Sequence, residues 1–141
     1  MDAARARGLA YANHQQRRNR HGELVIEHVA RVAAAVPPEA QTTAWLHDVL
    51  EASPITLEQL RHRGLSEIEA QAIDLLTRPD SESYEAHALR TAHAPELAGR
   101  LARMVKLADL DDHLARPWTC GDPPYAWARR RIVNGSTAMA S

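Results

Sequence analysis

The chain has 141 residues, of which 45% are hydrophobic and 25% charged, and its formal net charge is −1. We expect a chain of this length and composition to form one ordinary globular domain that buries roughly two thirds of its unfolded surface, and a second domain would not fit comfortably. The near-neutral charge gives no electrostatic reason to expect a nucleic-acid polymer or a membrane surface as a partner, although small charged ligands remain open.

Cysteine usage and hydropathy indicate the cellular compartment. The single cysteine, Cys120, excludes an internal disulfide framework, and no apolar run is long enough for a signal peptide or a membrane span. We therefore expect a cytoplasmic protein with no membrane partner. The spacing of residues does not decide between a monomer and a dimer.

The residues available for a core favour helices. Phe is absent and Ala is abundant, so the core has to be built from Leu, Ala, Val and Ile, with Trp45 as a bulky filler. A core rich in Ala and Leu favours helices that pack closely together. Because no segment alternates at period two for long enough to compete, we expect an all-α fold.

The first half of the chain divides into helices at its helix breakers. Pro37-Pro38 ends the second helix, and the third ends before Pro54. The pattern predicts helices over residues 2–16, 23–36 and 39–52. A basic loop, residues 17–22, separates the first two.

The next two helices are predicted from their N-terminal caps. Thr56 is followed by Gln59 and Ser66 by Glu69, and both pairs are typical of capping boxes. They predict a short helix that ends at Gly64 and another over residues 67–77.

The remaining segments contain a long helix and a Pro-rich stretch. We expect helices over residues 82–93, over about 95–115 and near 125–133, the last after a break at residues 117–124. The single domain therefore covers residues 1–133, and the polar residues 134–141 are expected to be a disordered tail. Packing is the leading interpretation of the aromatic residues in this part of the chain, with a pocket lid or a subunit contact left open: Trp118, Tyr125 and Trp127.

Residues with ligand chemistry lie in apolar contexts of three predicted helices. Glu51 lies one turn after His47-Asp48, so that one helix presents an imidazole and two carboxylates in one direction. His28 and Asp109 lie in equally apolar segments. Since a buried polar group is costly unless it is paired or binds a metal, the set suggests a site for a divalent transition ion such as Mn²⁺, Fe²⁺, Co²⁺, Ni²⁺ or Zn²⁺.

The order His, His-Asp, Asp on helices resembles the HD superfamily of metal-dependent phosphohydrolases. Further segments narrow the resemblance to the hydrolase domain of RelA/SpoT-type alarmone enzymes and their small relatives. The resemblance covers about residues 8–115, and residues 116–133 form a C-terminal extension beyond it. These segments are Gln16-Arg17-Arg18, Ile26-Glu27-His28-Val29-Ala30, Ala44-Trp45-Leu46-His47-Asp48-Val49-Leu50-Glu51, Leu75-Leu76-Thr77-Arg78-Pro79, Glu82-Ser83-Tyr84 and Val105-Lys106-Leu107-Ala108-Asp109-Leu110.

The resemblance implies a compact HD-domain helical bundle that removes the 3′-pyrophosphate of guanosine tetra- or pentaphosphate, (p)ppGpp. It implies Mn²⁺ held by His28, His47, Asp48 and Asp109. A bound cation lowers the pKa of its water from about 15.7 towards 7 and neutralises phosphoryl charge. Glu51 is then placed to accept the proton of the water as the catalytic carboxylate.

The chain departs from the family pattern at a few positions. Ala52 stands where the active alarmone hydrolases carry an aspartate, Val25 replaces a common aromatic residue, and His113 replaces an asparagine. These changes keep three alternatives open: an HD hydrolase of another nucleotide such as a nucleoside monophosphate, a catalytically weakened nucleotide-binding module, and a helical interaction domain with a vestigial site.

We expect the substrate phosphates to meet positively charged or hydrogen-bonding side chains. Lys106 is the only lysine of the chain and precedes Asp109 by one turn, so it is a candidate phosphate contact, with an ordinary ion pair as the alternative. Arg18, by the resemblance, and His113, by its position in the motif, complete the predicted substrate-binding set. The other basic residues considered are expected at the solvent-exposed surface: His14, Arg17, Arg20, His21, His62, His87 and His93.

Overall fold

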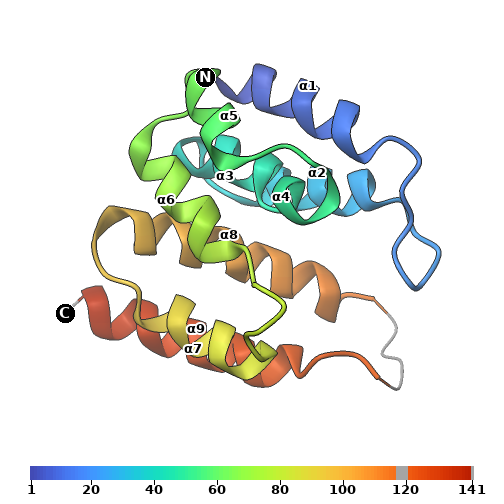
Figure 1. The fold of residues 1–141 in the computed structure, drawn as a ribbon. Coiled ribbons are helices and arrows are strands. Elements are labelled where there is room, and N and C mark those ends of the chain that lie inside the picture. The colour runs from blue at the N-terminus through green and yellow to red at the C-terminus, as the bar shows by residue number, and fades with distance from the viewer. Residues whose placement is uncertain (117–120, 141) are drawn as a thin grey trace.

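The computed structural model describes residues 1–116 and 121–140 and shows an all-α bundle, which confirms the predicted fold class (Figure 1). In these two ranges the only β-type pairing is an isolated bridge between Arg18 and Leu24. The helices, in chain order, are α1 (Ala3–His14), α2 (Val25–Ala35), the 3-10 turn η1 (Pro38–Ala40), α3 (Gln41–Leu46), α4 (Val49–Ala52), α5 (Leu57–His62), α6 (Glu67–Leu76), α7 (Tyr84–His93), α8 (Glu96–Leu114) and α9 (Tyr125–Ala140).

Helix α8 lies between the two parts of the bundle. It contacts α2, α3 and α6 on one side and α7 and α9 on the other (Figure 1). Its residues Ala102 and Val105 belong to the apolar cluster shared with α2 and α6, whereas Leu110 belongs to the cluster formed with α7 and α9. Any side chain that α8 directs between these clusters is therefore shielded from water by several helices.

The predicted caps form local hydrogen bonds in the structure. Thr56 and Gln59 make both bonds of a capping box at the start of α5. At the start of α6 the Ser66 hydroxyl accepts from the Glu69 backbone N–H at 3.2 Å and donates to the Glu69 carboxylate at 2.8 Å. Both side-chain caps satisfy backbone N–H groups that the first turn of a helix leaves free.

The prediction of one continuous helix over residues 39–52 is wrong. The structure divides it into η1, α3 and α4, and His47 and Asp48 form the turn between α3 and α4. The His47 backbone N–H bonds to the carbonyl of Ala44, three residues back, at 3.4 Å, which is a tighter turn than that of an α-helix. The interruption places His47 and Asp48 at the end of one short helix and the start of the next.

The C-terminal helix is longer than the sequence indicates. The expected disordered tail begins at residue 134, yet α9 continues to Ala140. Ile132 is fully buried, and Gly135 is buried where α9 meets α7. A β-carbon at Gly135 would lie 2.1 Å from the carbonyl oxygen of Ala92, so the absence of a side chain allows the two helices to touch. Polar composition alone does not reveal this contact.

No helix within the described ranges has both the length and the apolar character that a membrane crossing requires.

The close contact at Gly135 predicts opposite effects for two Gly→Ala substitutions. Gly135→Ala should lower the free energy of unfolding by about 1–3 kcal/mol, because the new methyl group collides with backbone. Gly8→Ala, in α1 with no heavy atom within 4 Å of the added carbon, should raise it by about 0.5–1 kcal/mol. Urea unfolding of both variants measures the difference; equal effects would mean that residues past 133 do not pack as described.

Candidate metal centre and its cavity

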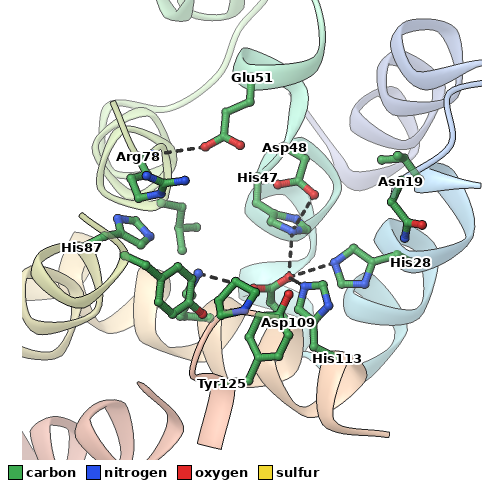
Figure 2. A pocket seen from close by; sticks show the side chains of 15 residues that line it. Asn19, His28, His47, Asp48, Glu51, Arg78, His87, Asp109, His113 and Tyr125 are labelled. Atoms are coloured by element: carbon green, nitrogen blue, oxygen red, sulfur yellow. Dashed lines mark hydrogen bonds and ion pairs between the residues drawn. The ribbon is translucent and has the colours of Figure 1, made fainter. Parts of the chain in front are cut away.

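Four side chains from separate parts of the chain converge on one point (Figure 2). His28 comes from α2, His47 and Asp48 from the turn between α3 and α4, and Asp109 from α8. Asp109 Oδ1 lies 2.8 Å from His28 Nε2 and 3.6 Å from His47 Nε2, while Asp48 Oδ2 lies 3.3 Å from His47 Nε2. The structure therefore brings together all four residues that the sequence predicts as metal ligands.

The arrangement of the donor atoms fits a bound cation better than it fits direct hydrogen bonds among the four side chains. His47 Nε2 is buried and has no hydrogen-bond partner among the described residues, although two carboxylates face it at 3.3 and 3.6 Å. A buried polar atom without a partner costs free energy, and a bound cation would remove that cost. The ligand atoms form two overlapping sets, each within 4.8 Å: His28, His47 and Asp48, and His28, Asp109 and His113. Imidazole and carboxylate ligands fit the transition ions expected from the sequence.

Electrostatics within the cluster show that it requires positive charge. Burial would raise the pKa of the Asp109 carboxyl, but Lys106 and the three imidazoles around it hold this pKa well below its usual range. Burial would lower the pKa of His47, but the carboxylates of Asp48 and Asp109 raise it to about 9. The Asp109 carboxylate thus remains ionised, and protons on the imidazoles or a cation must balance its charge.

Glu51 stands apart from the cluster, at the exposed rim of the same cavity (Figure 2). Its Oε1 accepts a hydrogen bond from the backbone N–H of Arg78 at 3.1 Å. Partial desolvation and the nearby charge of Asp48 raise the pKa of its carboxyl. A carboxylate with a raised pKa is a better proton acceptor, which is the property expected of the predicted catalytic residue.

The cavity has a volume of about 260 Å³ and combines the metal ligands with groups that bind anions. Lys106 Nζ lies 3.5 Å from Asp109 Oδ2 and above the ring of Tyr84, at 5.4 Å. His113 Nε2 lies 3.4 Å from Asp109 Oδ1. Arg78, which the substrate-binding prediction did not include, also lines the wall.

Arg18, predicted to bind substrate, is placed differently. Its side chain is exposed, and its guanidinium donates to the carbonyl of Gly22 at 2.6 Å. The neighbouring Asn19, rather than Arg18, lines the cavity. The isolated bridge between Arg18 and Leu24 fixes this loop against the start of α2.

Part of the cavity wall comes from the C-terminal segment that the resemblance does not cover. Tyr125, at the start of α9, stacks on His113 with ring centroids 4.4 Å apart and an interplanar angle of 4°. Trp127 packs with its neighbours in the core cluster of α7, α8 and α9. Trp118 lies outside the described residues, so its interpretation stays a prediction. Of the interpretations left open, Tyr125 shapes the pocket and Trp127 serves packing.

Two histidines expected at the surface are buried instead. His14 is fully buried, because it follows Ala6 and Ala10 at intervals of four on the inner face of α1. His87 is 2% exposed and lines the cavity from α7. The spacing of Ala6, Ala10 and His14 is visible in the sequence and was a signal for burial. Both predictions of a surface position were wrong.

Comparison of this chain with protein-family models and with curated proteins finds no match.

The position of His87 predicts a specific loss of stability in acid. Burial and the positive charges of Lys106 and Arg90 lower the pKa of His87 to about 4, against 6.5 in an unfolded chain. Between these values the unfolded chain takes up a proton at His87 that the folded chain does not, so stability is lost as the pH falls. His87→Phe should reduce the loss of unfolding free energy between pH 7 and pH 4.5 by about 2 kcal/mol.

The measurement is urea unfolding of chelator-treated protein at both pH values. His62→Gln is the matched control, because His62 is exposed on α5. If the two variants and the unmodified protein show the same dependence on pH, His87 is not neutral in the folded state.

Proposed function

We propose that the chain is a metal-dependent phosphohydrolase that acts on a nucleotide. The observation that supports this most directly is the convergence of His28, His47, Asp48 and Asp109, with a buried Nε2 of His47 that no described residue satisfies. The leading substrate, from the sequence resemblance, is guanosine tetra- or pentaphosphate, from which the enzyme would remove the 3′-pyrophosphate.

The four ligands would hold the ion, and His113 is a further donor on the Asp109 side of the cluster. Mn²⁺ is the leading ion because of the resemblance, and Fe²⁺, Co²⁺, Ni²⁺ and Zn²⁺ suit the same ligands. When bound, such an ion lowers the pKa of a water molecule and neutralises negative charge on a phosphoryl oxygen.

The side chains around the ligands would orient the phosphate and move the proton. Lys106 and Arg78 offer positive charge on one wall, where they would attract phosphoryl oxygens. Glu51 Oε1 is held by the Arg78 N–H, which leaves Oε2 to accept the proton of the attacking water. In the proposed mechanism Glu51 alone would accept the proton at the rim, without an aspartate at position 52.

The size of the cavity supports binding of the phosphate end of a nucleotide. Its volume of about 260 Å³ lies below the ~300–1,000 Å³ of sites that enclose drug-sized ligands. A phosphate or pyrophosphate group would occupy the cavity, and the nucleoside would extend from its mouth. Contacts outside the cavity would then distinguish one nucleotide from another.

A hydrolysis assay tests the proposal. Mn²⁺-loaded protein should release pyrophosphate from guanosine tetraphosphate in a panel that also holds its adenosine counterpart and nucleoside mono-, di- and triphosphates. His47→Ala and Asp48→Asn should lose both bound Mn²⁺ and turnover, because each removes a ligand. Asp111→Asn, an exposed residue paired with Arg129, should retain both.

The products distinguish the alternatives. Orthophosphate from another nucleotide would keep the metal mechanism and replace the substrate. Bound Mn²⁺ without turnover of any nucleotide would contradict the enzyme and favour a nucleotide-binding module; Ala52→Asp would then show whether an added carboxylate restores hydrolysis. Partner binding that survives Asp48→Asn would favour an interaction domain.

Glu51→Gln should separate catalysis from metal binding. We expect turnover to fall by about 10²–10⁴, the usual contribution of a general base, while the affinity for Mn²⁺ stays within about twofold. Gln keeps the hydrogen bond from the Arg78 N–H but cannot accept the proton. Single-turnover rates and a Mn²⁺ titration check both parts, and unchanged turnover would exclude Glu51 as the base.

A further inference from the structure

Both imidazoles of the proposed metal centre have a fixed Nδ1 atom. His47 Nδ1 lies 2.6 Å from the carbonyl oxygen of Ala44, and His28 Nδ1 lies 2.6 Å from Asp112 Oδ2. Carbonyl and carboxylate oxygens only accept hydrogen bonds, so Nδ1 is the donor in both rings. Each ring therefore directs its Nε2 towards the cluster, where Nε2 would bind the ion.

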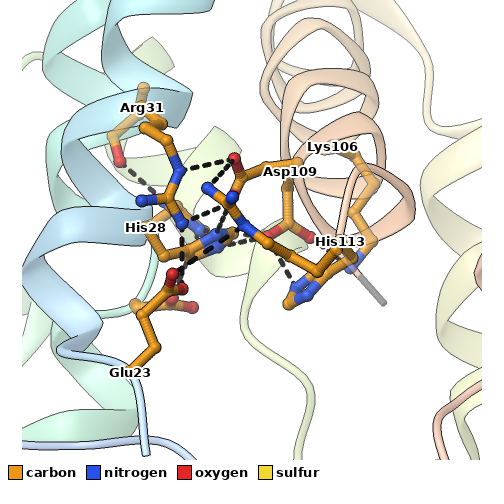
Figure 3. A network of polar contacts seen from close by, with 11 residues as sticks. Glu23, His28, Arg31, Lys106, Asp109 and His113 are labelled. Atoms are coloured by element: carbon orange, nitrogen blue, oxygen red, sulfur yellow. Dashed lines mark hydrogen bonds and ion pairs between the residues drawn. The ribbon is translucent and has the colours of Figure 1, made fainter. Parts of the chain in front are cut away.

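The acceptor for His47 is backbone, but the acceptor for His28 is a side chain that must itself be held. Arg31 holds it: its Nε lies 2.7 Å from Asp112 Oδ1, and its Nη2 lies 3.0 Å from Asp112 Oδ2. Glu23 Oε1 in turn accepts from Arg31 Nη2 at 2.9 Å (Figure 3). Both oxygens of Asp112 are engaged, which restricts rotation of the carboxylate.

The residues of this network come from two helices, and on each helix the two residues are three positions apart. Arg31 follows His28 by three residues on α2, and Asp112 follows Asp109 by three residues on α8. Residues three apart share a face of a helix, so the pair on α2 meets the pair on α8. His28 contacts both aspartates, Asp109 through Nε2 and Asp112 through Nδ1.

We infer that Asp112 is a positioning residue of the metal centre, which holds the ring of His28 through Nδ1 while Arg31 holds Asp112. The inference rests on the metal-binding part of the proposed function and is independent of the substrate. Carboxylates that accept from a metal-binding histidine fix its tautomer and orientation and increase its basicity as a ligand. The Asp112 side chain is 11% exposed, so solvent competes little for its hydrogen bonds.

The test compares metal affinity in Asp112→Ala, Asp112→Asn and the neighbouring control Asp111→Asn. Chelator-treated proteins are titrated with Mn²⁺ and with Zn²⁺. Asp112→Ala should weaken binding about 10- to 100-fold, Asp112→Asn less, and Asp111→Asn by less than about twofold. Should Asp112→Ala fail to fold, Asp112→Asn carries the comparison, since Asn keeps an acceptor oxygen and the size of the side chain.

A spectroscopic measurement separates positioning from a structural role. In ¹⁵N-labelled, Zn²⁺-loaded protein the Nδ1–H signals of His28 and His47 should both be observed; the Asp112 substitutions should shift or broaden only that of His28. If the melting temperature falls while metal affinity and the His28 signal stay unchanged, Asp112 merely joins α2 to α8 and the inference is overturned.

The outcomes for the inference and the proposed function are distinct. Wild-type protein that binds metal and hydrolyses no nucleotide contradicts the proposed enzyme, while the affinity series still decides the role of Asp112. Wild-type protein that binds neither ion overturns both.

Discussion

The buried Asp109 carboxylate constrains how the helices around it are arranged. Its Oδ1 is shared by three imidazoles, and Lys106 Nζ lies 3.5 Å from Oδ2. An ionised carboxylate in such a place is tolerated only if positive charge and hydrogen bonds surround it. The segments that supply those groups are α2, the turn between α3 and α4, and α8. They must therefore keep a fixed relation to one another, and the apolar clusters on either side of α8 maintain it.

The imidazoles that stabilise the Asp109 carboxylate are also the groups that could bind a metal ion. In the absence of a cation, the imidazoles of His28 and His47, whose pKa values are raised, hold protons and supply the positive charge that balances the carboxylates. A divalent ion would replace those protons, so metal binding should release protons and be weakened in acid. The same electrostatic requirement thus explains why the cluster is stable when buried and why it is suited to binding a cation.

The sequence predicts the helical class, most helix positions and the residues that meet in the cluster, because local spacing and polar residues in apolar contexts carry that information. It does not predict features that depend on contacts between distant segments. The engagement of Asp112 by Arg31 and His28 and the stacking of Tyr125 on His113 arise only when helices meet. The need for glycine at position 135 is equally hidden from the sequence, because it comes from the close approach of the Ala92 backbone.

The presence of Lys106 in the cavity wall has a practical consequence. Since every other basic side chain apart from histidine is arginine, this residue carries the only side-chain amine of the chain. An amine-selective reagent small enough to enter the cavity would label the interior of the site and no other side chain of this sequence. A bound anion that covers Lys106 would protect it, so the extent of labelling would report occupancy of the cavity without knowledge of the natural ligand.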